Sequence, residues 1–145
     1  RHAGVAGAAG EPHGSAATRK LVRERARSAG GVGHPHLSQH FLDARGDLVA
    51  QYRMDGALWR TVPVAQGKAA ASAAFNAPSG ELTDRWENPV MRTLSMMENG
   101  RLIPWQGALP IRRKDGIMLG AIGVSGAKSN EDEEVAAAGL AAAGF

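Results

Sequence analysis

Cysteine is missing from the 145-residue sequence, and so is any long apolar run. The absence of cysteine excludes disulfides, thiolate metal sites and a cysteine nucleophile. No apolar stretch approaches the roughly 18 residues that a membrane-spanning helix needs, so we expect a soluble protein. The chain begins at Arg1 without a charged start followed by an apolar run, so we expect a signal peptide to be absent or already removed. Secretion stays open, with a cytoplasmic location favoured.

Length and composition fit one domain with a single core. Hydrophobic residues make up 43% of the chain and charged residues 21%, which argues against global disorder. The formal net charge is +3, and the positive residues are scattered except for one cluster, which comprises Arg19, Lys20, Arg23, Arg25 and Arg27. No aromatic residues are interleaved with this cluster, so we expect a solvated helix face there and no nucleic-acid contact.

Residues 1–14 are mostly alanine and glycine without periodicity, which predicts a flexible tail before a single domain over 15–145. Local start and stop signals predict four helices. They run from Ser15 to Ser28, from Thr61 as the cap to Phe75, from Asn88-Pro89 to Gly100, and from Ser129 to Leu140. In the last helix, Ser129 and Asp132 resemble a capping box.

The predicted strands come in two hairpins. Residues 36–43 and 48–54 flank a turn that contains Gly46, and residues 111–113 and 117–124 flank Lys114-Asp115-Gly116. Residues 101–103 are a candidate fifth strand. Strands that come in adjacent pairs favour an α+β fold, with an antiparallel sheet flanked by helices, over a parallel doubly wound sheet.

The glycine-rich segment 120–126 matches neither the dinucleotide-binding fingerprint nor the nucleophile elbow. Its glycines recur every third residue and the chain ends too soon for a dinucleotide fingerprint. Ala127 stands where a nucleophile elbow needs glycine. We expect these glycines to allow close approach of a helix or a ligand.

Three histidines, His34, His36 and His40, fall at even positions before and within the first predicted strand. In a regular strand their imidazoles point to one face, where they could bind a metal or a haem iron. His40 is the one expected inside the fold, and His40 and His36 are the candidate metal ligands. Histidines at strand ends without a ligand role are the alternative.

The end of the second strand carries a cation, a carboxylate and a flexible glycine, in the segment Arg53-Met54-Asp55-Gly56, with Lys68 on the next helix. A salt bridge that fixes this corner is one interpretation. The other is an anion site, since arginine grips a carboxylate or propionate with two hydrogen bonds and lysine adds a point charge. Backbone amides from Ser125 to Ser129 could add to it.

At these motifs the sequence resembles the GlcG/HbpS-like haem-binding family, from about residue 20 to the end. The matching segments are Asp43 to Gly46, Arg53 to Ala57, Lys68-Ala69, Gly107 to Pro110 and Gly120 to Gly126. The resemblance implies a profilin-like three-layer domain with a five-stranded antiparallel sheet, usually oligomeric. The chain departs from the family where His36 to His40 replace an apolar run, and where Ala108 replaces the second glycine of the loop.

The resemblance implies a small-ligand-binding domain, with haem or a related tetrapyrrole as the expected cofactor. The expected ligand-binding residues are His40, Arg53, Asp55, Lys68, Pro110 and Ser125. We expect all of them except His40 to gather at one corner of the fold. A lyase or isomerase acting on a carboxylate, with Arg53 as anchor and His40 exchanging a proton, is one alternative. A structural or interaction subunit is another. A homo-oligomer is expected because the tryptophans and methionines exceed what a small core absorbs.

Overall fold

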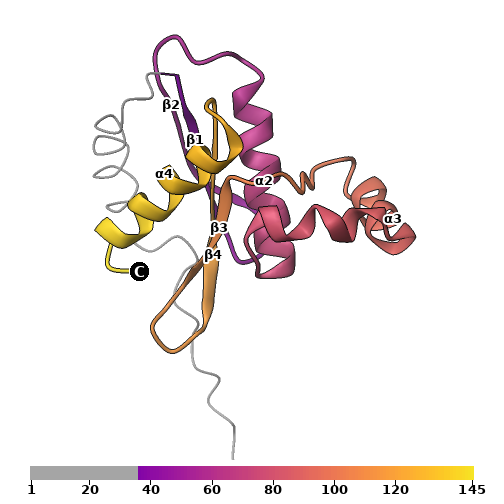
Figure 1. Cartoon of the computed structure of the whole chain (residues 1–145). Helices are drawn as coiled ribbons and strands as arrows, with labels where there is room; N and C mark the ends of the chain where they lie inside the picture. Colours follow the sequence, from indigo (N-terminus) through magenta and orange to yellow (C-terminus); the bar gives the residue numbers. More distant parts are fainter. Residues whose placement is uncertain (1–35) are drawn as a thin grey trace, which may run out of the picture.

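The computed structural model describes residues 36–145 (Figure 1). The expected tail over 1–14, the helix from Ser15 to Ser28, its basic cluster and His34 all lie outside the described residues. The elements run in the order β1 (Ser38–Asp43), β2 (Leu48–Arg53), α2 (Thr61–Phe75), η2 (Ser79–Leu82), η3 (Asp84–Glu87), α3 (Pro89–Met97), β3 (Ala108–Arg112), β4 (Met118–Ser125) and α4 (Ser129–Ala142). Both predicted hairpins and the three later helices are therefore confirmed.

Within residues 36–145 the sheet has four strands in the order β2-β1-β4-β3, and every neighbouring pair is antiparallel. The expected fifth strand over 101–103 belongs to no sheet. Instead, the amide of Ile103 donates to the carbonyl of Gly67 at 3.0 Å, which ties this segment to α2. Residues 101–103 are therefore not a strand, and the described part of the chain forms a sheet of four strands where five were expected.

Helices cover both faces of the sheet, α2 on one and α4 on the other, as Figure 1 shows. Because side chains alternate along a strand, neighbouring residues of β1 enter different cores. Phe41 packs with Ile122 and with Val135 of α4, whereas Leu42 packs with Ala69 of α2. The result is a three-layer α+β arrangement.

Small residues bring α2 unusually close to β4. A Cβ atom on Gly123 would lie only 2.2 Å from the carbonyl oxygen of Ala65 and 2.9 Å from the Cβ of Ala69. The glycine therefore allows backbone and helix to touch, as the glycine-rich segment predicted. The alanine-rich sequence of α2 serves the same contact.

The helix starts follow the predicted signals in one case and differ in two. The side chain of Asn88 accepts from the amide of Val90 and caps α3 as predicted. Thr61 is the first residue of α2 and no cap, because its hydroxyl bonds Leu58 and Ser38 instead. At α4 the box is closed by Glu131, which accepts from the amide of Lys128 at 3.0 Å, while Asp132 turns into the core.

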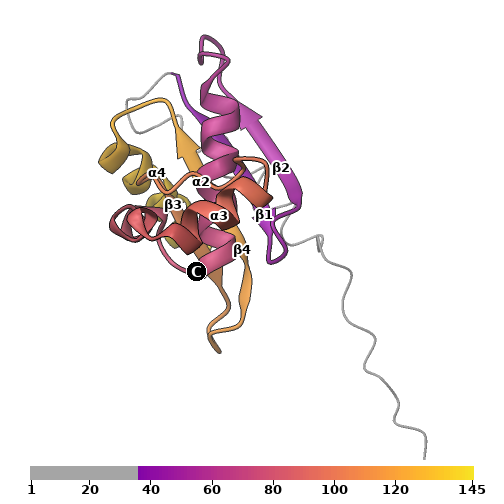
Figure 2. The same cartoon turned by 90° about the vertical axis from the view of Figure 1, so that its right-hand side faces the viewer.

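α3 lies on the side of α2 that faces away from the sheet (Figure 2). It buries only Met91, and it leaves Met96 and Met97 more than 70% exposed. Trp59 and Trp105 are 75% and 57% exposed. None of the helices within residues 36–145 is long and apolar enough to cross a membrane.

The close packing of α2 on β4 can be tested by substitution of Gly123. We expect Gly123→Ala to lower the free energy of unfolding by about 1–3 kcal/mol, because the added methyl group overlaps the Ala65 carbonyl. The same substitution at Gly139 in α4 is the matched control, since a Cβ there meets only the Ile122 side chain at 3.6 Å. Gly139→Ala should stabilise by about 0.5–1 kcal/mol through helix propensity. Urea unfolding measures both, and equal midpoints for Gly123→Ala and the natural protein would contradict the packing argument.

Candidate functional site

The strand register brings part of the predicted site together. Ser38 on β1 is paired with Arg53 on one side and with Ser125 on the other. With strands about 4.8 Å apart, the backbones of Arg53 and Ser125 are about 10 Å from each other. Pro110 lies apart from them, because it pairs with Ala121, four residues before Ser125 on β4.

Arg53 holds the loop that follows β2. Its Nε and Nη2 atoms both donate to the carbonyl oxygen of Ala57, at 3.1 and 2.6 Å. The corner is thus fixed through a carbonyl group and not through Asp55, whose side chain is exposed. The arginine itself stays exposed at the end of the sheet.

The loop after β2, which Arg53 holds, exposes apolar side chains beside an accessible histidine. Leu58 and Trp59 are 50% and 75% exposed. His36 precedes β1, is exposed, and lies against Gly56: a Cβ there would be 2.9 Å from its Nδ1 atom. Gly56 has a φ of 81°, so it suits both the turn and the ring. We call the group of His36, Arg53, Asp55, Leu58 and Trp59 the corner site.

His40 lies in a different environment. It pairs with Gly123, whose α-carbon faces α2, so the imidazole lies between β1 and that helix with none of its surface exposed. Neither ring nitrogen has a hydrogen-bond partner among residues 36–145. Burial lowers the pKa of the imidazole, and the side chain of Gln51 on the neighbouring strand opposes that shift. His40 is therefore held neutral and sealed from solvent.

The expected pairing of His36 and His40 on one strand face does not occur. The strand begins at Ser38, so His36 stands in the preceding turn, and the two imidazoles differ in exposure. No group of three potential metal-ligating side chains exists within the described part of the chain. The sealed position of His40 also gives no support to an enzyme that exchanges a proton through it.

Lys68 is taken up by a buried ion pair. Its Nζ atom lies 2.7 Å from Oδ2 of Asp132 and donates to the carbonyl of Val124 at 3.1 Å. Both side chains are at most 3% exposed. Burial raises the pKa of the Asp132 carboxyl, and the hydrogen bond from Lys68 opposes it. The ammonium group is therefore a structural element and does not reach a ligand at the surface.

The backbone amides before α4 are occupied as well. The amide of Ala127 donates to Oδ1 of Asp132 at 3.0 Å, and that of Lys128 donates to Glu131. Two acidic side chains of the helix itself thus fill the position proposed for an external anion. Sequence reasoning missed Asp132 as the partner of Lys68, although an acid at the start of α4 was the available signal.

Residues 15–141 match a protein family described as haem degrading protein HbpS-like. No curated protein matches the chain. A crystal structure of HbpS shares 27% identity, with a TM-score of 0.74 and coverage of 98% of both chains. A double mutant of the Streptomyces reticuli HbpS shares 30% identity, with a TM-score of 0.71 and coverage of 98% and 97%.

Two further solved structures are similar. PduOC in complex with haem shares 26% identity with a TM-score of 0.73, over 87% of this chain and 91% of the other. Klebsiella pneumoniae protein ORFY shares 22% identity with a TM-score of 0.75, over 89% and 88%. The last comparison bears on the fold alone.

The buried imidazole predicts a pH dependence of stability. Because the pKa of His40 is lowered in the folded state, the unfolded chain takes up a proton that the native chain does not. The free energy of unfolding should therefore fall as the pH drops below about 6.5, by up to about 1.4 kcal/mol per pH unit until the native pKa is reached.

Urea unfolding at a series of pH values measures this dependence. His40→Leu should remove this part of the slope, whereas His36→Gln, at an exposed histidine, should keep it. An unchanged slope in His40→Leu would show that the imidazole is solvated in the native state.

Proposed function

Since this chain belongs to the HbpS-like family of haem degrading proteins, we propose that it binds haem or a related tetrapyrrole. The family match covers residues 15–141, and one similar structure, PduOC, was solved with haem bound. One observation suggests where in this chain the haem would bind. The exposed ring of His36 lies beside the apolar loop of the corner site.

The corner site meets the three needs of a haem. An imidazole nitrogen must be accessible to the iron, apolar groups must lie against the porphyrin, and cations must pair with the propionates. His36 supplies the imidazole, Leu58 and Trp59 the apolar surface, and Arg53 and the exposed Arg60 the positive charge. Bound haem would supply an iron centre to this corner.

We assign the iron ligand to His36 in place of His40. A porphyrin can reach His40 only if α2 leaves β1, because the imidazole has no exposed surface. Separating those elements would uncover the core around Leu42 and Ala69, which opposes binding. His36 needs no such rearrangement. Arg53 acts as a positioning residue, since its bonds to Ala57 keep the loop beside His36.

We also propose that the domain is profilin-like. The antiparallel sheet, with α2 and α4 on opposite faces, supports this. A homo-oligomer is part of the same proposal. Its support is the apolar surface that one copy leaves exposed, on Trp59, Trp105, Met96 and Met97.

Light scattering tests the oligomer. We expect the full chain at micromolar concentration to have a mass that is a multiple of the 15.1 kDa of one copy. A mass of one copy at that concentration would remove the oligomer from the proposal and leave haem binding untouched.

Hemin titration tests the ligand and its position. We expect a sharp Soret band that saturates at one equivalent in the natural protein. His36→Ala should shift or abolish the band, because the iron loses its nitrogen ligand. His40→Leu is the matched control and should keep it, with circular dichroism confirming that both variants fold.

The outcomes separate the two parts of the proposal. If the natural protein gives no specific band, haem binding is wrong for this chain. A band that survives His36→Ala unchanged but shifts in His34→Ala would keep haem binding and move the ligand to a residue outside the described part.

A further inference from the structure

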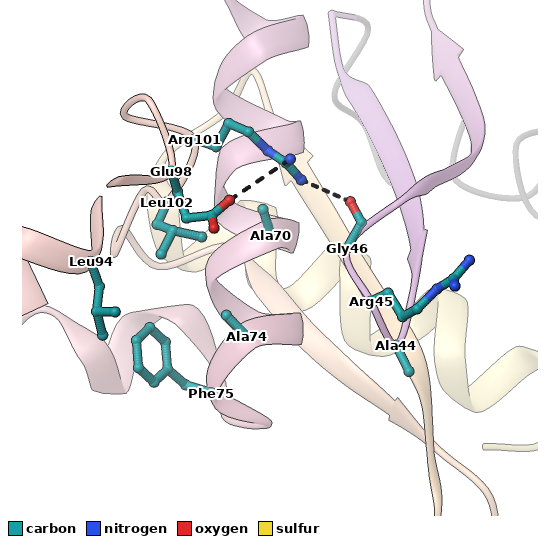
Figure 3. Close-up of a pocket in the computed structure, with 10 residues that line it drawn as sticks. All are labelled: Ala44, Arg45, Gly46, Ala70, Ala74, Phe75, Leu94, Glu98, Arg101 and Leu102. Carbon is teal, nitrogen blue, oxygen red and sulfur yellow. Dashed lines mark hydrogen bonds and ion pairs between the residues drawn. The ribbon is translucent and has the colours of Figure 1, made fainter. Parts of the chain in front are cut away.

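A cavity opens at the opposite end of the β1–β2 hairpin from the corner site. It has a volume of about 280 Å³ and lies between the hairpin turn, α2, and the end of α3 (Figure 3). Ala44 and Gly46 come from the turn, Ala70 and Ala74 from α2, and Leu94 from α3. Ligand pockets commonly form where separate elements meet in this way.

One wall of this cavity is apolar. Ala70 and Ala74 are four residues apart, so they share one face of α2, and their short side chains leave room in front of the helix. Phe75 stands at the end of this wall. Its ring is held edge-on by Trp86, at 6.1 Å and 85°, and Arg85 lies 5.6 Å from its centre. The wall suits a ring or a branched apolar chain.

The other end of the cavity carries one cation, Arg101, and one anion, Glu98. Nη2 of Arg101 donates to the carbonyl oxygen of Gly46 at 3.2 Å, and Nη1 lies 3.9 Å from Oε2 of Glu98. The second distance is longer than a hydrogen bond between charged groups, so both keep bonding capacity. Their side chains are 51% and 52% exposed. The guanidinium of Arg45 points away from this pair (Figure 3) and lies 3.5 Å from Asp47.

We propose that this cavity binds an apolar α-amino acid in its zwitterionic form. The ligand carboxylate pairs with Arg101, the ammonium group pairs with Glu98, and the side chain lies on the wall of Ala70, Ala74 and Phe75. A lone carboxylate would leave one unbalanced negative charge beside Glu98, and a lone amine one positive charge beside Arg101. Among ligands that carry charged groups, a zwitterion pairs with both residues and keeps the site neutral.

The volume agrees with this class of ligand. A cavity of about 150 Å³ takes up benzene, so the present volume has room for a ring or a branched chain and for the amino acid backbone. The cavity lies at the hairpin turn, at the other end of the hairpin from the proposed haem site, so the two sites are separate.

Isothermal titration calorimetry of the full chain tests the proposal, with L-phenylalanine and L-leucine as ligands. The comparison compounds are 3-phenylpropionate, which lacks the amine, and 2-phenylethylamine, which lacks the carboxylate. We expect each of these to bind at least about tenfold more weakly than phenylalanine, because each leaves one charged group without a partner.

Three variants locate the binding. Arg101→Gln and Glu98→Gln should each weaken phenylalanine about tenfold or more. Ala74→Leu should abolish binding by filling the cavity, and it changes an exposed helical alanine to another strong helix former, so the fold is kept. Arg92→Gln is the matched control, since Arg92 is an exposed arginine on α3 that pairs with Glu87 outside the cavity. It should leave the affinity unchanged.

Three results would overturn the inference. No binding heat from either amino acid at about 10 mM would exclude even a weak site. Equal affinity for phenylalanine and 3-phenylpropionate would remove the role of Glu98. Undiminished binding in Ala74→Leu would show that the ligand sits elsewhere.

Discussion

The ion pair between Lys68 and Asp132 joins the two helices that lie on opposite faces of the sheet. Lys68 belongs to α2 and Asp132 to α4, and their charged atoms meet at 2.7 Å beside the carbonyl of Val124 on β4. Removing one partner of such a buried pair leaves a charge without compensation, at a cost of about 3–5 kcal/mol. This contact therefore links all three layers, in addition to the apolar packing of each helix on the sheet.

Two glycines allow the close packing at and near this contact. A Cβ on Gly107 would lie 2.7 Å from Nζ of Lys68, so the loop before β3 can pass the pair only with glycine there. Gly123 lets α2 approach β4 in the same way. Because the interior is filled by this packing, the ammonium of Lys68 and the imidazole of His40 are both withdrawn from solvent. The two sites that we propose for ligands lie at the two ends of the β1–β2 hairpin.

The two ends offer different chemistry. At one end an exposed histidine stands beside a loop that Arg53 holds, with an apolar surface on Leu58 and Trp59. At the other end Arg101 and Glu98 stand together above an apolar wall. The hairpin itself is fixed by its turn, where Asp43 accepts from the amides of Arg45 and Asp47. One rigid strand pair thus supports two separate candidate sites.

The sequence by itself determined the local elements, because turns, caps and apolar periodicity act over a few neighbouring residues. It placed the start of α2 within one residue and its end at Phe75, and it predicted both hairpins and the cap at Asn88. Its motifs identified the family. Only the tertiary structure decided that Lys68 pairs with Asp132, 64 positions away, and that His40 is sealed while His36 is exposed. A strand pattern shows that residues alternate between two faces, but it does not show which helix covers each face, because that depends on packing between distant segments.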